Sequence, residues 1–242
     1  TPWVPVLSLV WTTGLTSIAA IAAFYLDWGL TSVVAVYVVA IPVSLAVAWS
    51  TRRRYGPETL ARGRGGLVLG ITAAVLALLQ QPWWFGTPDS YYHLSASRSL
   101  LILNQPVVTD PFFRIGSHVP DSTAGMWNTV QSVLSYLTTV DIAVLYPALT
   151  AVAAAAVVTA FWLMAEEVAD SRVATIMTGV YIVGAWYTDF RAFGYPNHVD
   201  IAFAFAAVAL LLQVMGEPRR PFVLAAAFAS FTALAVHLAS GE

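Results

Sequence analysis

The sequence predicts an all-α membrane protein that crosses the bilayer about seven times. Of its 242 residues, 59% are hydrophobic and only 10% are charged, and the mean hydropathy is +0.74. A soluble domain has about 25% charged residues, so this apolar excess is too large for one buried core. The composition therefore excludes a soluble or disordered protein and indicates one transmembrane domain over residues 1–242.

The counts of individual residue types exclude further classes. The absence of cysteine rules out disulfide scaffolds and thiolate metal sites. The 11 basic residues are all arginines, and with 13 acidic residues the net charge is −2, which argues against a nucleic-acid partner. The chain starts at Thr1 and stops directly after an apolar run, which we interpret as a fragment of a longer protein.

Seven uncharged stretches approach the roughly 20 apolar residues that a helix needs to cross the hydrocarbon. In chain order they are Val6–Leu26, Gly29–Trp49, Leu67–Phe85, Ile142–Ala165, Val173–Thr188, Ile201–Gly216 and Phe222–Ser240. The fifth and sixth are short, and we expect them to borrow a turn or to sit in thinned lipid. Pro42 and Pro147 are expected to kink the second and fourth. Gly66 and Gly70, four residues apart, predict close helix packing.

The arginines predict the orientation of these spans. Eight of the 11 lie in loops of one parity: Arg52, Arg53, Arg54, Arg62, Arg64, Arg172, Arg219 and Arg220. The positive-inside rule makes that side cytoplasmic, with the N-terminus inside. The four histidines and Arg98, Arg114 and Arg191 then fall outside. We expect a multi-pass protein of the cell membrane.

The outer side also carries a 56-residue loop, residues 86–141, which is long enough to be functional. Asp89 is placed to cap a helix over Ser90–Leu103, and Asp121 or Ser122 a second one that includes Trp127 and Asn128. Two such amphipathic helices are expected to lie flat on the outer membrane surface. The alternative is a lid that only packs on the bundle.

Two outer segments hold most of the residues suited to chemistry. In the first, Asp89 and His93 are four residues apart and share a helix face, although a helix cap and an interfacial histidine would also explain them. In the second outer loop, 189–200, an extended chain would point His198 and Asp200 the same way, with Asn197 beside them. A hydrated loop with Asp200 capping the next span is the alternative.

The predicted topology brings these groups to one membrane face, where we expect Asp89 to lie close to the 198–200 segment. Oxygen ligands with one imidazole suit Mg²⁺ or Mn²⁺, and such an ion beside a membrane would hold phosphate oxygens. Asp89, Asn197, His198 and Asp200 are the candidate ligands. Arg98 and Arg191 are candidates for pairing with a phosphate, or they reach toward lipid headgroups.

This pattern resembles the membrane glycosyltransferases of the GT-C fold, and within them the archaeal and bacterial single-subunit oligosaccharyltransferases. Pro-Asp89-Ser-Tyr-Tyr-His93 resembles the first family motif, an aspartate at the start of a long outer loop with two membrane-parallel helices. Arg191-Ala-Phe-Gly-Tyr-Pro-Asn-His-Val-Asp200 occupies the place of the second, acidic motif. The likeness covers about residues 67–216.

The resemblance implies a transferase that moves a sugar or oligosaccharide from a polyprenyl-(pyro)phosphate donor in the bilayer to an acceptor protein or glycan. Asp89 and His93 would be catalytic, and Asp89 with the His198–Asp200 segment would hold the ion. Pro196 stands where the second motif has its first acid, which favours an alternative: a metal-free transferase with a lipid monophosphate donor and Asp89 as general base. A transporter or a non-enzymatic scaffold is the third possibility.

The orientation is open to a direct test, because a chain without cysteine accepts single labelling sites. In intact cells, a membrane-impermeant thiol reagent should label His118→Cys in the long outer loop and should miss Glu58→Cys in the arginine-rich loop. Labelling at position 58 would overturn the orientation and, with it, the outer-face site.

Overall fold

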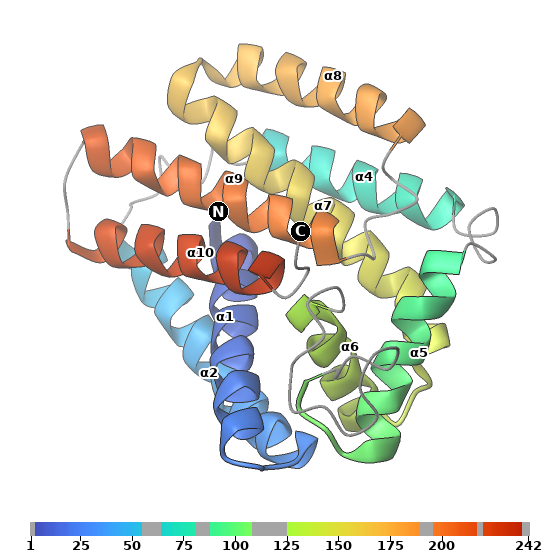
Figure 1. The fold of residues 1–242 in the computed structure, drawn as a ribbon. Coiled ribbons are helices and arrows are strands. Elements are labelled where there is room, and N and C mark those ends of the chain that lie inside the picture. Colours follow the sequence, from blue (N-terminus) through green and yellow to red (C-terminus); the bar gives the residue numbers. More distant parts are fainter. Residues whose placement is uncertain are drawn as a thin grey trace.

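The computed structural model describes residues 3–54, 64–80, 88–107, 125–188, 196–216 and 220–238, and the regular elements in these ranges are all α-helices. They are α1 (Trp3–Tyr25), α2 (Leu30–Arg54), α4 (Arg64–Gln80), α5 (Pro88–Leu103), α6 (Gly125–Thr138), α7 (Ile142–Val168), α8 (Ser171–Thr188), α9 (Pro196–Gly216) and α10 (Arg220–Leu238). The predicted all-α class is therefore confirmed for the described part of the chain (Figure 1).

Three of these helices are long and apolar enough to cross a membrane. They comprise Val4–Tyr25 in α1, Ile142–Val168 in α7 and Val199–Gly216 in α9. Four further apolar segments are shorter: Leu30–Ala46, Arg64–Gln80, Ser171–Ala185 and Phe222–Leu234. The length and composition of the three long helices indicate a helical membrane protein. Both α2 and α7 continue past their internal prolines, Pro42 and Pro147.

Helix α7 lies at the centre of the bundle, between α4 and α9 and in contact with α8 (Figure 1). It begins where the Asp141 carboxylate caps it by accepting a hydrogen bond from the backbone N–H of Ala143 at 2.8 Å. It ends at Val168, and Asp170 then caps α8 through the backbone N–H groups of Arg172 and Val173. A carboxylate cap thus starts the central helix, and another starts the helix that follows it.

Small residues let α4 approach α7 closely. The buried residues of α4 are Gly66, Gly70, Ala73 and Ala77, which form one stripe along the helix. A Cβ atom on Gly66 would lie 2.5 Å from the Trp162 ring, and one on Gly70 would meet the Thr159 hydroxyl and, at 3.1 Å, the backbone oxygen of Ala155. The predicted packing role of these two glycines is therefore confirmed.

Helix α1 packs on α2 and α10, which Figure 1 shows running in different directions. The Trp11 ring stacks on Phe228 of α10, with centroids 4.2 Å apart. A Cβ atom on Gly14 would lie 2.6 Å from the same Phe228 ring, so a glycine is needed for this approach. At the other end of α1, the backbone N–H of Leu30 donates to the carbonyl of Asn104 at 3.1 Å, which joins the α1–α2 turn to the end of α5.

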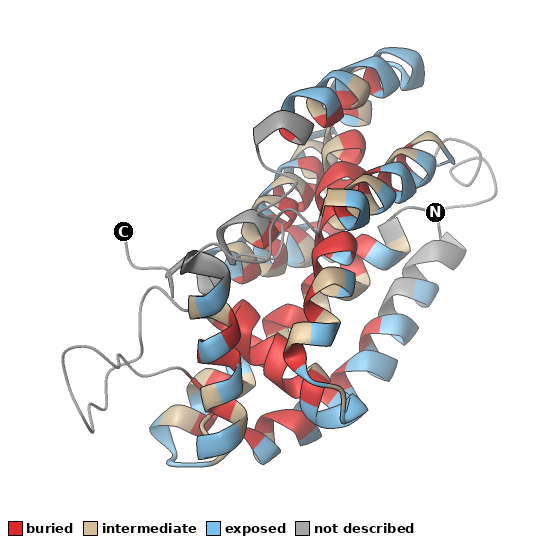
Figure 2. Ribbon diagram, turned by 90° about the vertical axis from the view of Figure 1, so that its right-hand side faces the viewer, coloured by how far each residue is buried: buried red, intermediate tan, exposed pale blue. Residues whose placement is uncertain are grey.

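The two helices predicted in the long loop are present as α5 and α6, but the expected surface position of α6 is wrong. All residues from Met126 to Val133 are buried, and α6 contacts six other helices. In Figure 2 the buried residues gather where the helices meet, in the interior of the bundle. The polar side of α6 faces α5 rather than water: the Ser97 hydroxyl of α5 donates to Gln131, and the Ser132 hydroxyl of α6 donates to the Ser97 carbonyl. Helix α6 therefore packs into the bundle, and its position relative to the membrane stays a prediction.

The α4–α7 contact predicts a steric effect specific to one glycine. Gly70→Ala should lower the free energy of unfolding by about 1–3 kcal/mol, since the added methyl meets Thr159 and the Ala155 backbone. Gly179→Ala on α8 is the matched control, because a Cβ atom there has nothing within 4 Å and should cause no loss. Thermal unfolding in detergent, followed by tryptophan fluorescence, compares the two. Equal stability of both variants would contradict the close packing.

Candidate functional site at the α5–α6 hairpin

The amino end of α5 carries the motif that the sequence singled out. The helix begins at Pro88, which fits a first turn because its missing N–H has no helical partner there. Asp89 is therefore the second residue of the helix and not its cap. The side chain of Asp89 lies outside the described residues. His93 lies one turn further along, and Ser97 one turn beyond that.

His93 and Ser97 face polar residues of α6 across a buried seam. The Nδ2 atom of Asn128 lies 3.2 Å from Nδ1 of His93. The Ser97 hydroxyl donates to Oε1 of Gln131 at 3.0 Å. The Ser132 hydroxyl lies 2.8 Å from the Ser97 carbonyl and 2.7 Å from the Asn128 carbonyl, and it donates toward them. We call these five residues the polar seam.

Burial requires the polar groups of the seam to form hydrogen bonds with one another. Ser97, Asn128, Gln131 and Ser132 all have 0% exposed surface. A buried polar group without a partner costs about 1–3 kcal/mol of folding free energy, so each residue of the seam must pair with the residue opposite it. Sliding α6 along α5 would break several pairs at once. The seam therefore holds α5 and α6 in one register and places His93 in a defined position.

Arg98, a candidate for binding a donor phosphate, has an acidic partner in the structure. Its guanidinium lies 2.7 Å from Oδ1 of Asp141, and both side chains are about half exposed, at 50% and 51%. The hydrogen bond from Arg98 and the one from the backbone of Ala143 hold the pKa of Asp141 below its ordinary value of 3.8. Asp141 thus joins α5 to the start of α7 while it caps α7.

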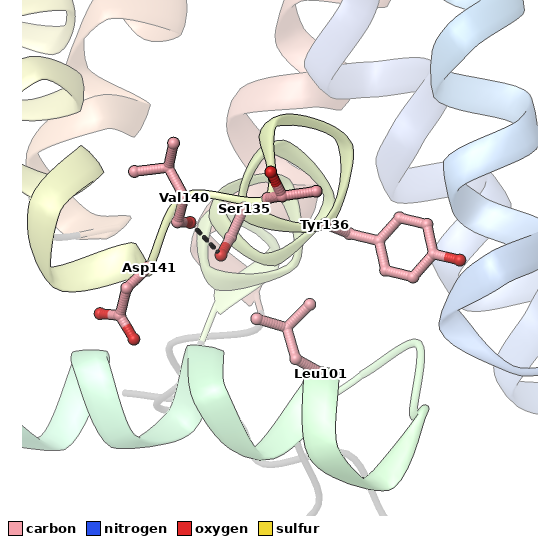
Figure 3. Close-up of a pocket in the computed structure, with 6 residues that line it drawn as sticks. Leu101, Ser135, Tyr136, Val140 and Asp141 are labelled. Carbon is pink, nitrogen blue, oxygen red and sulfur yellow. Dashed lines mark hydrogen bonds between the residues drawn. The ribbon is translucent and has the colours of Figure 1, made fainter.

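An open depression of about 630 Å³ lies beside this ion pair, between the carboxyl ends of α5 and α6. It is lined by Leu101, Ser135, Tyr136, Thr139, Val140 and Asp141. In Figure 3 the Ser135 hydroxyl donates to the Val140 carbonyl, a 2.7 Å bond, while the Tyr136 ring points away from Asp141. Asp141 is the one charged residue in this lining, and its negative charge would repel a phosphate group.

The second predicted segment has a different backbone from the expected one. Helix α9 begins at Pro196, so Asn197, His198 and Asp200 are helical and the expectation of a loop through residue 200 is wrong. The reason is that a proline in a first turn starts a helix rather than preventing one. Side chains two apart on a helix do not face each other, so the shared direction inferred for His198 and Asp200 does not hold. Residues 197 and 200, three apart, share a face.

Several predicted site residues lie outside the described part of the structure. Arg191 and residues 189–195 are among them, as are the side chains of Asn197 and His198. Asp200 is described and is partly buried, in the first turn of α9. Helix α6 contacts both α5 and α9. The proximity of Asp89 to the 198–200 segment stays a prediction.

The polar residues of α6 are the part of the site that sequence reasoning misplaced. The sequence shows that Asn128, Gln131 and Ser135 share one face of the helix, but a helix lying flat on the membrane surface would turn that face toward water. The spacing of His93 and Ser97 is the signal that could have placed this face, because it gives α5 a matching polar face.

Comparison of the chain with protein-family models, with curated proteins and with solved structures finds no match in any of the three.

Asp141 predicts a stability effect that depends on pH. Asp141→Ala removes both the cap and the ion pair and should cost about 1–2 kcal/mol, with the cap as the larger part because exposed pairs contribute less than about 1 kcal/mol. Asp141→Asn keeps the cap and should cost less. A lowered pKa stabilises the folded state above the ordinary value of 3.8, and this is lost as the pH falls further. Melting temperatures of wild type and Asp141→Asn should therefore differ at pH 7 and converge in acid. A gap that persists in acid would refute the ion-pair contribution.

Proposed function

We propose that this protein is an integral membrane glycosyltransferase with seven spans and the GT-C fold. It takes a sugar or oligosaccharide from a polyprenyl-phosphate or -pyrophosphate donor, at the outer face of the cell membrane. The acceptor is a protein or a glycan. The observation that carries the proposal is the place of the Asp89–His93 motif: it opens a helix whose His93 is held in a buried polar seam by α6.

Contacts between helix ends support the alternating topology in the proposal. The α1–α2 turn bonds to the end of α5 through Leu30 and Asn104, both of which the arginine count places outside. The Gln213 amide donates to Glu167 at 2.6 Å, and both lie at helix ends assigned to the inside. The start of α4 at Gly65 lies against Thr175 near the start of α8, also inside. Each of these contacts joins ends that the topology assigns to one side.

The proposed reaction needs few protein groups. The bond between the sugar's anomeric carbon and the donor phosphate breaks while the acceptor's nucleophilic atom bonds to that carbon. Asp89 orients the acceptor or takes its proton, and His93 acts beside it. Arg98 and Arg191 are the proposed partners of the departing phosphate, whose negative charge grows in the transition state. For Arg98 this role requires exchange of Asp141 for the phosphate.

A Mn²⁺ or Mg²⁺ ion remains part of the proposal, with Asp89, Asn197, His198 and Asp200 as its proposed ligands. When bound, it would neutralise charge on the donor phosphates. The helical start of α9 fits only part of this set, because residues 197 and 200 share a face and residue 198 does not. That observation favours the second candidate, a metal-free transferase that uses a polyprenyl monophosphate donor with Asp89 as general base.

A substitution that keeps size but removes charge tests the enzymatic role. In the source organism, deleting the gene should enlarge the pool of polyprenyl-linked sugars, as measured by mass spectrometry of lipid extracts, and wild type should restore it. Asp89→Asn should fail to restore it, with transfer reduced about 100-fold or more. Asp170→Asn is the matched control, because Asp170 caps α8 and asparagine caps equally well. A pool unaffected by deletion would leave a transporter or scaffold as the better account.

Chelation separates the two transferases. With a divalent ion, EDTA should abolish sugar transfer in isolated membranes, and Mn²⁺ or Mg²⁺ should restore it. His198→Ala and Asp200→Ala should each then raise the metal concentration required. Full activity in EDTA, with Asp89→Asn still inactive, would reject the metal and select the monophosphate transferase.

A further inference from the structure

The structure assigns Asn128 a role in fixing the proton of His93: we propose that Asn128 is a positioning residue that holds His93 as the neutral Nε2–H tautomer. A neutral imidazole has one N–H donor and one acceptor nitrogen, and the partner of one nitrogen decides the state of the other. The group opposite Nδ1 of His93 is the side-chain amide nitrogen of Asn128, at 3.2 Å. An amide nitrogen only donates, so Nδ1 accepts and the ring proton resides on Nε2.

Packing in the polar seam holds the Asn128 side chain opposite His93. Asn128 is 0% exposed, and its backbone carbonyl accepts from Ser132 one turn later. The neighbouring hydrogen bond, from Ser97 to Gln131, fixes the register of α5 against α6. The ring of His93 also meets Tyr92 edge-on, with centroids 5.3 Å apart. These contacts limit both the ring and the amide opposite it.

The tautomer decides what His93 can do. An Nε2–H group donates a hydrogen bond but has no lone pair on that nitrogen, so Nε2 is neither a metal ligand nor a base. It fits an acceptor oxygen, which a phosphate group or a sugar hydroxyl supplies. The inference thus refines the catalytic role proposed for His93 to that of a donor toward such an oxygen, and this functional part rests on the proposed transferase. The tautomer itself does not.

Nitrogen NMR of the detergent-solubilised protein with ¹⁵N-labelled histidine reads the tautomer directly. The chain has four histidines, and the signal lost in His93→Gln identifies the residue. Above the titration range of the ring, wild type should show His93 as Nε2–H alone. Asn128→Ala should show a mixture of both tautomers. Asn128→Asp, whose carboxylate only accepts, should shift the proton to Nδ1.

Ser97→Ala is the control, since it removes a neighbouring rung of the seam and leaves the atoms opposite His93 in place. It should keep the wild-type tautomer. A mixture or the Nδ1–H form in wild type overturns the inference without any variant having to fold. A pure Nε2–H signal in Asn128→Ala overturns it too, because Asn128 would not be the determinant. The lipid-linked sugar pool tests the transferase separately, so the two proposals fail independently.

Discussion

Burial of the polar side of α6 is the constraint on which the arrangement depends. Asn128, Gln131 and Ser132 sit inside an apolar bundle with 0% exposure, where each hydrogen bond left unmade would cost about 1–3 kcal/mol. Helix α5, with His93 and Ser97 one turn apart, carries matching groups. Once this pair is formed, α6 presents its remaining sides to α1, α2, α7, α9 and α10. A loop segment thereby becomes part of the core.

Different kinds of contact hold α7 and α6 in the bundle. Around α7 the contacts are steric: glycines of α4 lie against Trp162 and Thr159, without which the helices would stand further apart. Around α6, hydrogen bonds with α5 accompany apolar contacts and specify the register of the two helices. In a lipid environment such small-residue contacts and interhelical hydrogen bonds replace the hydrophobic effect as the source of helix association.

These contacts fix the positions of the candidate site residues His93 and Asp141. His93 gains a defined position because it belongs to the polar seam, and Asp141 links α5 to α7 through Arg98 while capping the central helix. Asp200 lies in the first turn of α9, a helix that also contacts α6. The three helices that begin near these residues, α5, α7 and α9, all contact α6.

The sequence by itself determined the helical class, the apolar segments, the close contact at Gly66 and Gly70, and a helix over Ser90–Leu103, because these follow from local composition and spacing. It did not determine where the polar side of α6 points. Amphipathicity shows that Asn128 and Gln131 share a face, but water and a polar neighbour satisfy that face equally well, and only the tertiary structure chooses α5. The sequence also left the start of α9 open, because a proline such as Pro196 can either break a helix or begin one. The packing of α6 on α5 and the helical start of α9 together decide which residues share a face.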